Sequence, residues 1–384
     1  MLAITNGKII TMKEGQIFNK GTVLIKAGKI KKIGQNLEIP EGAKIIDATG
    51  KVVFPGLIDA HTHLGIGEEG IGWEGQDYNE MTDPITPHLR AIDAINPEDE
   101  GIKDAREQGI TTVMTGPGSA NVLGGENLVM KTAGSVIDEM VMKSPAGIKA
   151  AFGENPKRVY SDQQKTPSTR MAVAALMRET FMETQDYLQE KAKANEEQKS
   201  FKRDIKMESL ARVLNREIPL KAHAHRADDI LTILRIAREF EIDVTLEHCT
   251  EGHKVVSQIA EAGFPAIVGP TLTGKVKVEL KNRSFKTAGI LAKAGVEVAL
   301  MSDHPVIPTY NLPLYAALAV KAGMPEQDAL RAITINPARI LGVDDRIGSL
   351  EAGKDADLVI FDGNPLQINT GVETVIINGE IIEE

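Results

Sequence analysis

The chain has 384 residues, 42% of them hydrophobic and 26% charged, a balance that excludes disordered and fibrous proteins. Lysine and arginine total 44 against 54 aspartates and glutamates, and the resulting net charge of −10 argues against a protein that binds the backbone of nucleic acids. A single cysteine, Cys249, rules out an intrachain disulfide, and no apolar run approaches the roughly 18 residues of a membrane span, so we expect a cytoplasmic protein without membrane contact.

Both ends of the chain contain short, β-branched, alternating segments that are separated by glycine-containing turns. This pattern is typical of β-strands. Neither end is long enough to bury a core alone, so we expect the two ends to pack together as a small β-sandwich domain. The predicted strands are Leu2–Thr11, Gly21–Ile33, Lys44–Asp47, Ala356–Phe361 and Thr374–Ile382.

The middle of the chain alternates short apolar segments with helical patterns. Such segments are typical of parallel strands buried on both faces. Eight of them over this length predict an α/β fold, a (β/α)8 TIM barrel, with a doubly wound open sheet as the alternative. The predicted domains are 1–52 plus 350–384 for the β-sandwich and 53–349 for the barrel. The eight segments are Leu57–His63, Thr111–Thr115, Leu128–Thr132, Gly147–Phe152, Leu220–His225, Asp243–His248, Ala266–Gly269 and Glu297–Asp303.

The longest connection between predicted strands is a helical segment. Thr166-Pro167 is a favourable helix start, since proline suits the first helical position. The charged run Gln189–Lys206 indicates a long helix with a solvated distal half, or alternatively a lid or an oligomer contact over the barrel mouth. The pattern leaves both interpretations, and a homo-oligomer, open.

Histidines gather where the predicted strands end. His61 and His63 are two residues apart on one strand, so their side chains face the same side. Three more of the eight histidines, His223, His225 and His248, end other strands, and Asp303 ends the eighth. Because the carboxyl ends of barrel strands converge, and imidazole with carboxylate suits transition metals, the pattern predicts a site for a divalent metal.

Four segments resemble the amidohydrolase superfamily, especially its imidazolonepropionase-like and prolidase-like branch. The first, Gly50–His63, resembles the first-strand motif of the family, and Leu246–Thr250 and Met301–His304 resemble its sixth-strand histidine and eighth-strand aspartate. The fourth, Gly348–Pro365, resembles the entry into the terminal β domain. The resemblance covers the full chain and implies a metal-dependent hydrolase with a small-molecule substrate.

The resemblance implies a ligand set of one or two metal ions. His61, His63 and Asp303 would hold one ion, and His248 with His223 would hold a second; either His223 or His225 could be the fifth-strand ligand, and we favour His223. A bridging ligand would be either Lys149, as a carbamate, or Glu154. Zinc is the expected ion, with nickel, manganese and iron as alternatives.

The implied reaction is hydrolysis of a C–N bond in an amide, a cyclic amide or a dipeptide-like substrate. Asp303 would shuttle the proton and His225 would stabilise the oxyanion, while His304 and Arg170 are candidates for contacting the substrate. One alternative is a hydrolytic deaminase of a nucleobase-like amidine. Deaminases of the superfamily carry a glutamate three residues after the fifth-strand histidine, where this chain has Arg226. The other alternative is a barrel that has lost its chemistry and acts as a scaffold.

Overall fold

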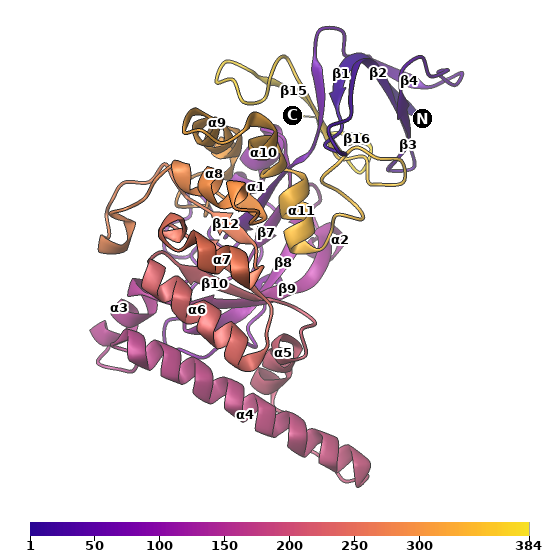
Figure 1. Ribbon diagram of the computed structural model, residues 1–384. Helices are drawn as coiled ribbons and strands as arrows, with labels where there is room; N and C mark the ends of the chain where they lie inside the picture. The colour runs from indigo at the N-terminus through magenta and orange to yellow at the C-terminus, as the bar shows by residue number, and fades with distance from the viewer. Residues whose placement is uncertain (384) are drawn as a thin grey trace.

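The computed structural model describes residues 1–383 and contains two separate sheets, one built from both chain ends and one from the middle of the chain (Figure 1). The terminal sheet has the order β16-β15-β14-β5-β1-β2-β3, and β4 pairs with β1. Its strands are β1 (Leu2–Ile10), β2 (Ile17–Lys26), β3 (Lys29–Gly34), β4 (Lys44–Asp47), β5 (Val52–Pro55), β14 (Leu358–Phe361), β15 (Val372–Ile377) and β16 (Glu380–Ile381).

The two chain ends are joined through β5, a strand that the sequence analysis did not predict. β5 pairs with β1 on one side and with β14 on the other. Side chains from both ends, among them Ile4, Val53 and Ile360, form one buried core. The expected terminal β domain is therefore confirmed. β5 spans the predicted boundary between residues 52 and 53, and the division into domains stays a prediction.

The second sheet is an eight-stranded barrel with the order β13-β12-β11-β10-β9-β8-β7-β6. The strands at the two ends of this order, β13 and β6, contact each other, so the sheet is nearly closed. Most of its residues are fully buried, as expected for strands covered on both faces. The strands are β6 (Leu57–Thr62), β7 (Ile110–Thr115), β8 (Leu123–Lys131), β9 (Val141–Ala151), β10 (Leu220–Ala224), β11 (Val244–His248), β12 (Ala266–Val268) and β13 (Val298–Leu300).

The barrel fold is confirmed, but the expectation that all eight strands run parallel is wrong for β8. This strand is antiparallel to both β7 and β9. The physical reason is the connection: residues 116–122 join β7 to β8 without a helix, whereas a parallel crossover needs about a dozen residues or more. As a result the start of β8, and not its end, lies at the barrel face where the other strands end.

The helices lie mainly around the barrel, and the longest, α4, extends away from it at the end opposite the terminal sheet (Figure 1). They are α1 (Glu100–Glu107), α2 (Ile137–Met140), α3 (Glu154–Asp162), α4 (Arg170–Glu196), α5 (Ile205–Leu214), α6 (Ala227–Phe240), α7 (Val256–Ala262), α8 (Lys286–Lys293), α9 (Leu312–Lys321), α10 (Glu326–Arg331) and α11 (Ile335–Leu341). No helix among residues 1–383 is long and apolar enough to cross a membrane.

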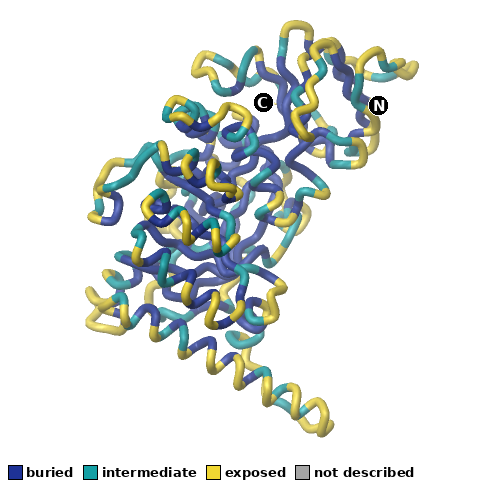
Figure 2. The backbone as a smooth tube through the Cα atoms, in the orientation of Figure 1, coloured by how far each residue is buried: buried dark blue, intermediate teal, exposed yellow. Residues whose placement is uncertain are grey.

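Helix α4 differs from its prediction at both ends. It begins at Arg170, and not at Thr166-Pro167, because the Thr169 side chain caps it by accepting a hydrogen bond from the Ala172 amide. It ends at Glu196, so the charged run Gln189–Lys206 is divided between α4, a turn and the start of α5. The distal part of α4 is largely exposed (Figure 2).

Candidate metal centre and active site

The structure brings the six predicted side chains at the strand ends into two adjoining groups of metal-ligand type. Within each group the ligand atoms lie within 4.8 Å of one another. The five histidines are buried, whereas Asp303 is partly exposed. The His61 and His248 rings, one from each group, have centroids 5.3 Å apart. The groups are His61, His63 and Asp303, and His223, His225 and His248.

The barrel strands explain why these side chains meet. His61 lies on β6, His223 on β10 and His248 is the last residue of β11, and these strands run in the same direction at one end of the barrel. Two group members have a left-handed backbone, with φ of +67° for His248 and +58° for Asp303. Such a conformation costs roughly 1–3 kcal/mol in a non-glycine residue and persists only where the surroundings enforce it.

Four of the five histidines are oriented through their Nδ1 atoms. His63 Nδ1 lies 2.6 Å from the Gly116 carbonyl oxygen and His248 Nδ1 lies 3.0 Å from that of Gly269. His225 Nδ1 lies 2.8 Å from the Thr250 hydroxyl, and His61 Nδ1 contacts the buried Glu247 carboxylate. Partners of this kind fix the orientation of each ring and leave its Nε2 for an ion or a substrate.

His223 is the exception, since both of its ring nitrogens are buried without a hydrogen-bond partner in residues 1–383. Burial, reinforced by the neighbouring imidazoles, holds its pKa well below the usual range, so the ring is neutral. A neutral imidazole with unpaired nitrogens beside two further histidines is chemically suited to a transition metal. The donor set and these unpaired atoms together fit a divalent ion.

Asp303 is the carboxylate of the centre. Its Oδ1 lies 3.3 Å from His61 Nε2 and 3.4 Å from His63 Nε2. Burial alone would raise its pKa, but His248, His61 and His63 together hold the pKa well below the usual range. The side chain is therefore a carboxylate at neutral pH, able to bind a cation or accept a proton.

The two candidates for the bridging ligand differ in position. Lys149 on β9 is fully buried, its Nζ lies 3.2 Å from His61 Nε2, and burial lowers its pKa. Glu154 is the first residue of α3 and belongs to neither group; its carboxylate lies 4.0 Å from the Arg158 guanidinium. The structure therefore brings Lys149, and not Glu154, against a residue of the metal-ligand groups.

The two predicted substrate contacts lie outside the cavity that the groups open into. Arg170 donates to the Asp229 carboxylate at 2.9 Å and lines a separate pocket beside α4 and α6. His304 is buried, its ring lies beside Gly101 and its Nε2 is 3.8 Å from Glu69. Neither residue is among those that line the cavity.

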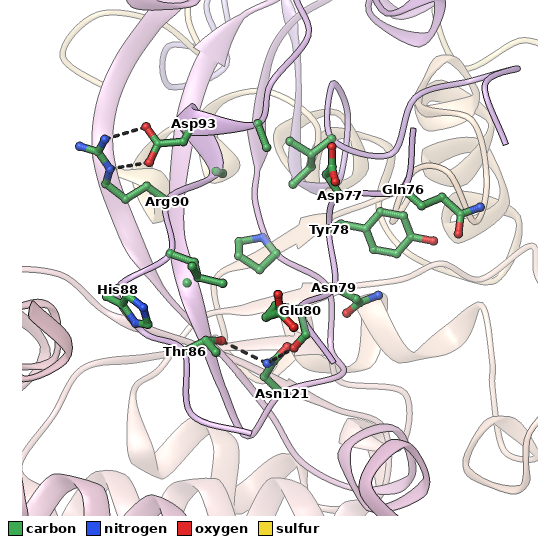
Figure 3. Close-up of a pocket in the computed structure, with 16 residues that line it drawn as sticks. Gln76, Asp77, Tyr78, Asn79, Glu80, Thr86, His88, Arg90, Asp93 and Asn121 are labelled. Atoms are coloured by element: carbon green, nitrogen blue, oxygen red, sulfur yellow. Dashed lines mark hydrogen bonds and ion pairs between the residues drawn. The ribbon is translucent and has the colours of Figure 1, made fainter. Parts of the chain in front are cut away.

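The cavity at the centre has a volume of about 540 Å³. Tyr78 stacks on His63 with ring centroids 5.3 Å apart. A second pocket, of about 440 Å³, is drawn with its lining residues in Figure 3. Tyr78 and Asn79 line both spaces. The other lining residues of the central cavity come mainly from loops after the strands.

Two buried carboxylates at the site, Glu247 and Glu279, are not among the residues predicted from the sequence. Glu247 on β11 contacts His61, and burial of its charge is offset by His61, Lys221 and Lys149, which hold its pKa at about 2. Glu279 is buried, with one oxygen 3.7 Å from His225 Nε2. Glu247 could have been found as a charged residue inside an apolar strand. Glu279 lies in a short 3-10 helix, Val278–Leu280, and no sequence signal marks it.

Comparison with known proteins agrees with this geometry. Residues 52–382 match the amidohydrolase family. The chain belongs to that family. Amidohydrolases act on C–N bonds, and the chain is a hydrolytic enzyme of this kind.

Individual relatives support the assignment over nearly the whole chain. The amidohydrolase tasK of Hapsidospora irregularis is 30% identical over 94% of this chain, which spans only 39% of that protein's length. An imidazolonepropionase of Geobacillus sp. (strain WCH70) is 28% identical, covering 97% of this chain and 92% of its own. The crystal structure of an amidohydrolase from Thermotoga maritima MSB8 superposes with a TM-score of 0.97 at 47% identity, covering both chains completely.

Proposed function

We propose that this amidohydrolase hydrolyses an amide, a cyclic amide or a dipeptide-like substrate with metal ions held by the two histidine groups. The observation that carries the proposal is the adjacency of the groups, with Lys149 Nζ 3.2 Å from His61 Nε2. His61, His63 and Asp303 would hold one ion, and His223 and His248 the other. Lys149 would be the bridging ligand as a carbamate, formed from its neutral amine and CO2 with release of a proton, so that an anionic group replaces a poorly solvated ammonium.

A divalent ion bound there would lower the pKa of a bound water molecule towards about 7 and polarise a carbonyl oxygen. Asp303, ionised and 13% exposed in its side chain, would accept the proton of the attacking water and deliver it to the leaving nitrogen. His225 is neutral, because burial lowers its pKa to about 3. With the Thr250 hydroxyl donating to Nδ1, its Nε2–H would donate to the oxyanion.

The deaminase alternative has less support. Arg226, at the position where deaminases carry glutamate, pairs with Asp228 at 2.7 Å and does not line the cavity. Asp303 is the only carboxylate among the described lining residues. A group that protonates a ring nitrogen would have to be Asp303 itself. We therefore favour amide hydrolysis.

Metal analysis of purified variants tests the proposal. Wild type is expected to contain one or two equivalents of a divalent transition metal, zinc before nickel, manganese or iron. The double variant His61→Ala/His63→Ala should lose at least one equivalent, whereas His253→Ala, a histidine that bonds to Thr287 outside both groups, should lose none. Full metal occupancy in the double variant would refute the ligand assignment. Amine release from amides and cyclic amides then tests the reaction.

A further inference from the structure

The charged groups around the cavity are few and are placed on different elements. Of the described residues that line it, Lys277 is the only lysine or arginine and Asp303 is the only carboxylate. Asp303 belongs to the metal-ligand group, whereas Lys277 lies in the loop that follows β12, outside both groups. The cavity therefore has one positive charge that the proposed reaction does not use.

In the part of the chain that the structure describes, Lys277 has one hydrogen-bond partner, and that partner is neutral. Its Nζ donates to the Asn155 side-chain oxygen at 2.6 Å, and the Asn155 amide nitrogen donates in turn to the Ser119 hydroxyl at 2.7 Å. No carboxylate within residues 1–383 lies within 4.0 Å of this Nζ, although several surface lysines of the chain have such a partner. An ammonium has three donors, so two remain for a ligand.

The same loop supplies a second unused donor and an apolar surface. The Thr273 hydroxyl is buried without a hydrogen-bond partner in the described chain, and Thr273 lines the cavity. Apolar side chains make up much of the remaining lining: Pro270, Leu272, Val276, Leu280, Val306 and Ile307. A ligand with one anionic end and one aliphatic group would match both features.

We propose that the substrate is an amide that carries a carboxylate, bound by Lys277, and an aliphatic group that packs on the loop after β12. The inference rests on the proposed amide hydrolysis and narrows its substrate class to N-acyl amino acids and carboxylate-bearing cyclic amides. A dipeptide has a free, positively charged amino group that would need a carboxylate partner. Dipeptides therefore fit less well, because Asp303, the only carboxylate in the described lining, is assigned to metal binding and proton transfer. Lys277 acts here as a specificity-determining residue.

Matched acid and amide probes test the inference. N-acetyl-L-leucine and N-acetyl-L-leucinamide differ only in the charged carboxylate, and wild type should favour the acid by about tenfold or more in kcat/KM, the usual strength of a hydrogen bond to a charged group. Lys277→Met should abolish this preference through KM, with kcat little changed, because the contact is the same in ground and transition states. Lys277→Arg should retain part of it.

Lys275→Met is the matched control, because Lys275 lies two residues away on the same loop, is exposed and does not line the cavity. It makes the same change in net charge and should leave the preference intact. Asn155→Asp should weaken the preference by placing a competing carboxylate beside Nζ. An acid preference that survives in Lys277→Met would show that the carboxylate binds elsewhere, for example at the metal, and would overturn the inference.

Binding measurements separate failure of the inference from failure of the proposed function. If metal-loaded wild type hydrolyses neither probe nor any other amide, amide hydrolysis is refuted, and calorimetric titration of the same two probes then decides the inference. Tighter binding of the acid in wild type and Lys275→Met, but not in Lys277→Met, supports it. Equal affinities in all three proteins, or no detectable binding of either probe, overturn it.

Discussion

Asp303 combines two properties that separate it from the other carboxylates near the centre. Its Oδ1 lies 3.3 Å and 3.4 Å from the Nε2 atoms of His61 and His63, and its residue lines the cavity. Glu247 is equally ionised, but it lies behind His61 and does not line the cavity. Only Asp303 can therefore touch a bound ion and also reach a water molecule beside it.

We expect Asp303→Asn to lower kcat by at least about 10²-fold, since asparagine preserves the shape but cannot accept the proton. The measurement compares kcat of wild type and variant, at equal metal content, on whichever substrate releases amine most rapidly. Circular dichroism should show the same fold in both. A variant that keeps more than about a tenth of wild-type kcat would exclude Asp303 as the proton shuttle and direct attention to His225.

Loss of the second metal equivalent in a variant would show which residue, Lys149 or Glu154, is the bridging ligand. Lys149→Ala should lose that equivalent, because the bridging carbamate cannot form, and bicarbonate with a short-chain carboxylic acid should partly restore it. Glu154→Gln should keep the metal content, since its carboxylate faces Arg158. Elemental analysis checks both. The opposite result, with metal lost in Glu154→Gln and kept in Lys149→Ala, would assign the bridge to Glu154.

At the residue scale, the sequence predicted which side chains gather at the strand ends but not what surrounds them. The spacing of His61 and His63, and the positions of His223 and His248 at strand ends, follow from side-chain alternation, which is local. Arg170 was predicted as a substrate contact, but its side chain pairs with Asp229. That partner is 59 residues away in the sequence, so only the tertiary structure shows the pair. Lys277 lies in a loop, where conformation does not follow from periodicity.

At the element scale, the junction between the terminal sheet and the barrel depends on a close approach of two strands. Gly56 links β5 to β6, and a Cβ at this position would lie 2.0 Å from the Thr111 hydroxyl oxygen and 2.8 Å from the Thr111 Cβ on β7. Real side chains do not approach so closely, so β6 or β7 would have to shift. Both strands lead into the active-site face.

Gly56→Ala is therefore expected to destabilise the protein by about 1–3 kcal/mol, the usual cost of overpacking. Gly371→Ala is the control, because its new Cβ would meet its nearest atom, on Asp362, at an ordinary 3.5 Å and Gly371 has no left-handed backbone. Urea denaturation midpoints measure the difference. Equal midpoints for the two variants would mean that the junction relaxes without cost.

The reversed strand β8 shows which part of an element the sequence can predict. Its apolar residues predicted a buried strand correctly, since burial on both faces depends on composition. Direction is not encoded in that composition. The direction of a strand depends on the length of the connection before it. The start of β8 was predicted at Leu128, five residues too late, so the predicted connection of residues 116–127 was long enough for a parallel crossover.

At the scale of the whole molecule, a buried ionic cluster joins the barrel to the terminal domain. Lys131 at the end of β8 lies 2.8 Å from the Asp355 carboxylate and 3.0 Å from that of Asp357. Arg346 lies 2.8 Å from Asp355, which also contacts Lys29 of β3. The carboxylates belong to the segment that enters β14, so the cluster connects three distant parts of the chain.

The cluster predicts a specific pH dependence of stability. Burial alone would raise the pKa of Asp355, but hydrogen bonds from Lys131 and Lys29 lower it from 3.8 to about 2. A carboxyl group whose pKa is lower in the folded than in the unfolded protein stabilises the fold fully above the unfolded value. This stabilisation, on the order of 2 kcal/mol, is lost as the pH falls from about 4 to about 2.

Asp355→Asn should therefore remove this part of the acid sensitivity. We expect the difference in unfolding free energy between wild type and variant to be constant near neutral pH and to shrink by about 2 kcal/mol between pH 4 and pH 2. Asp357, whose pKa burial raises, gives the opposite slope and offsets part of the wild-type loss. Urea denaturation at several pH values measures the difference, with Asp162→Asn, an exposed aspartate, as control. If the difference between wild type and Asp355→Asn does not change with pH, the cluster does not stabilise the ionised form of Asp355, and this carboxylate does not contribute to the joint between the barrel and the terminal domain.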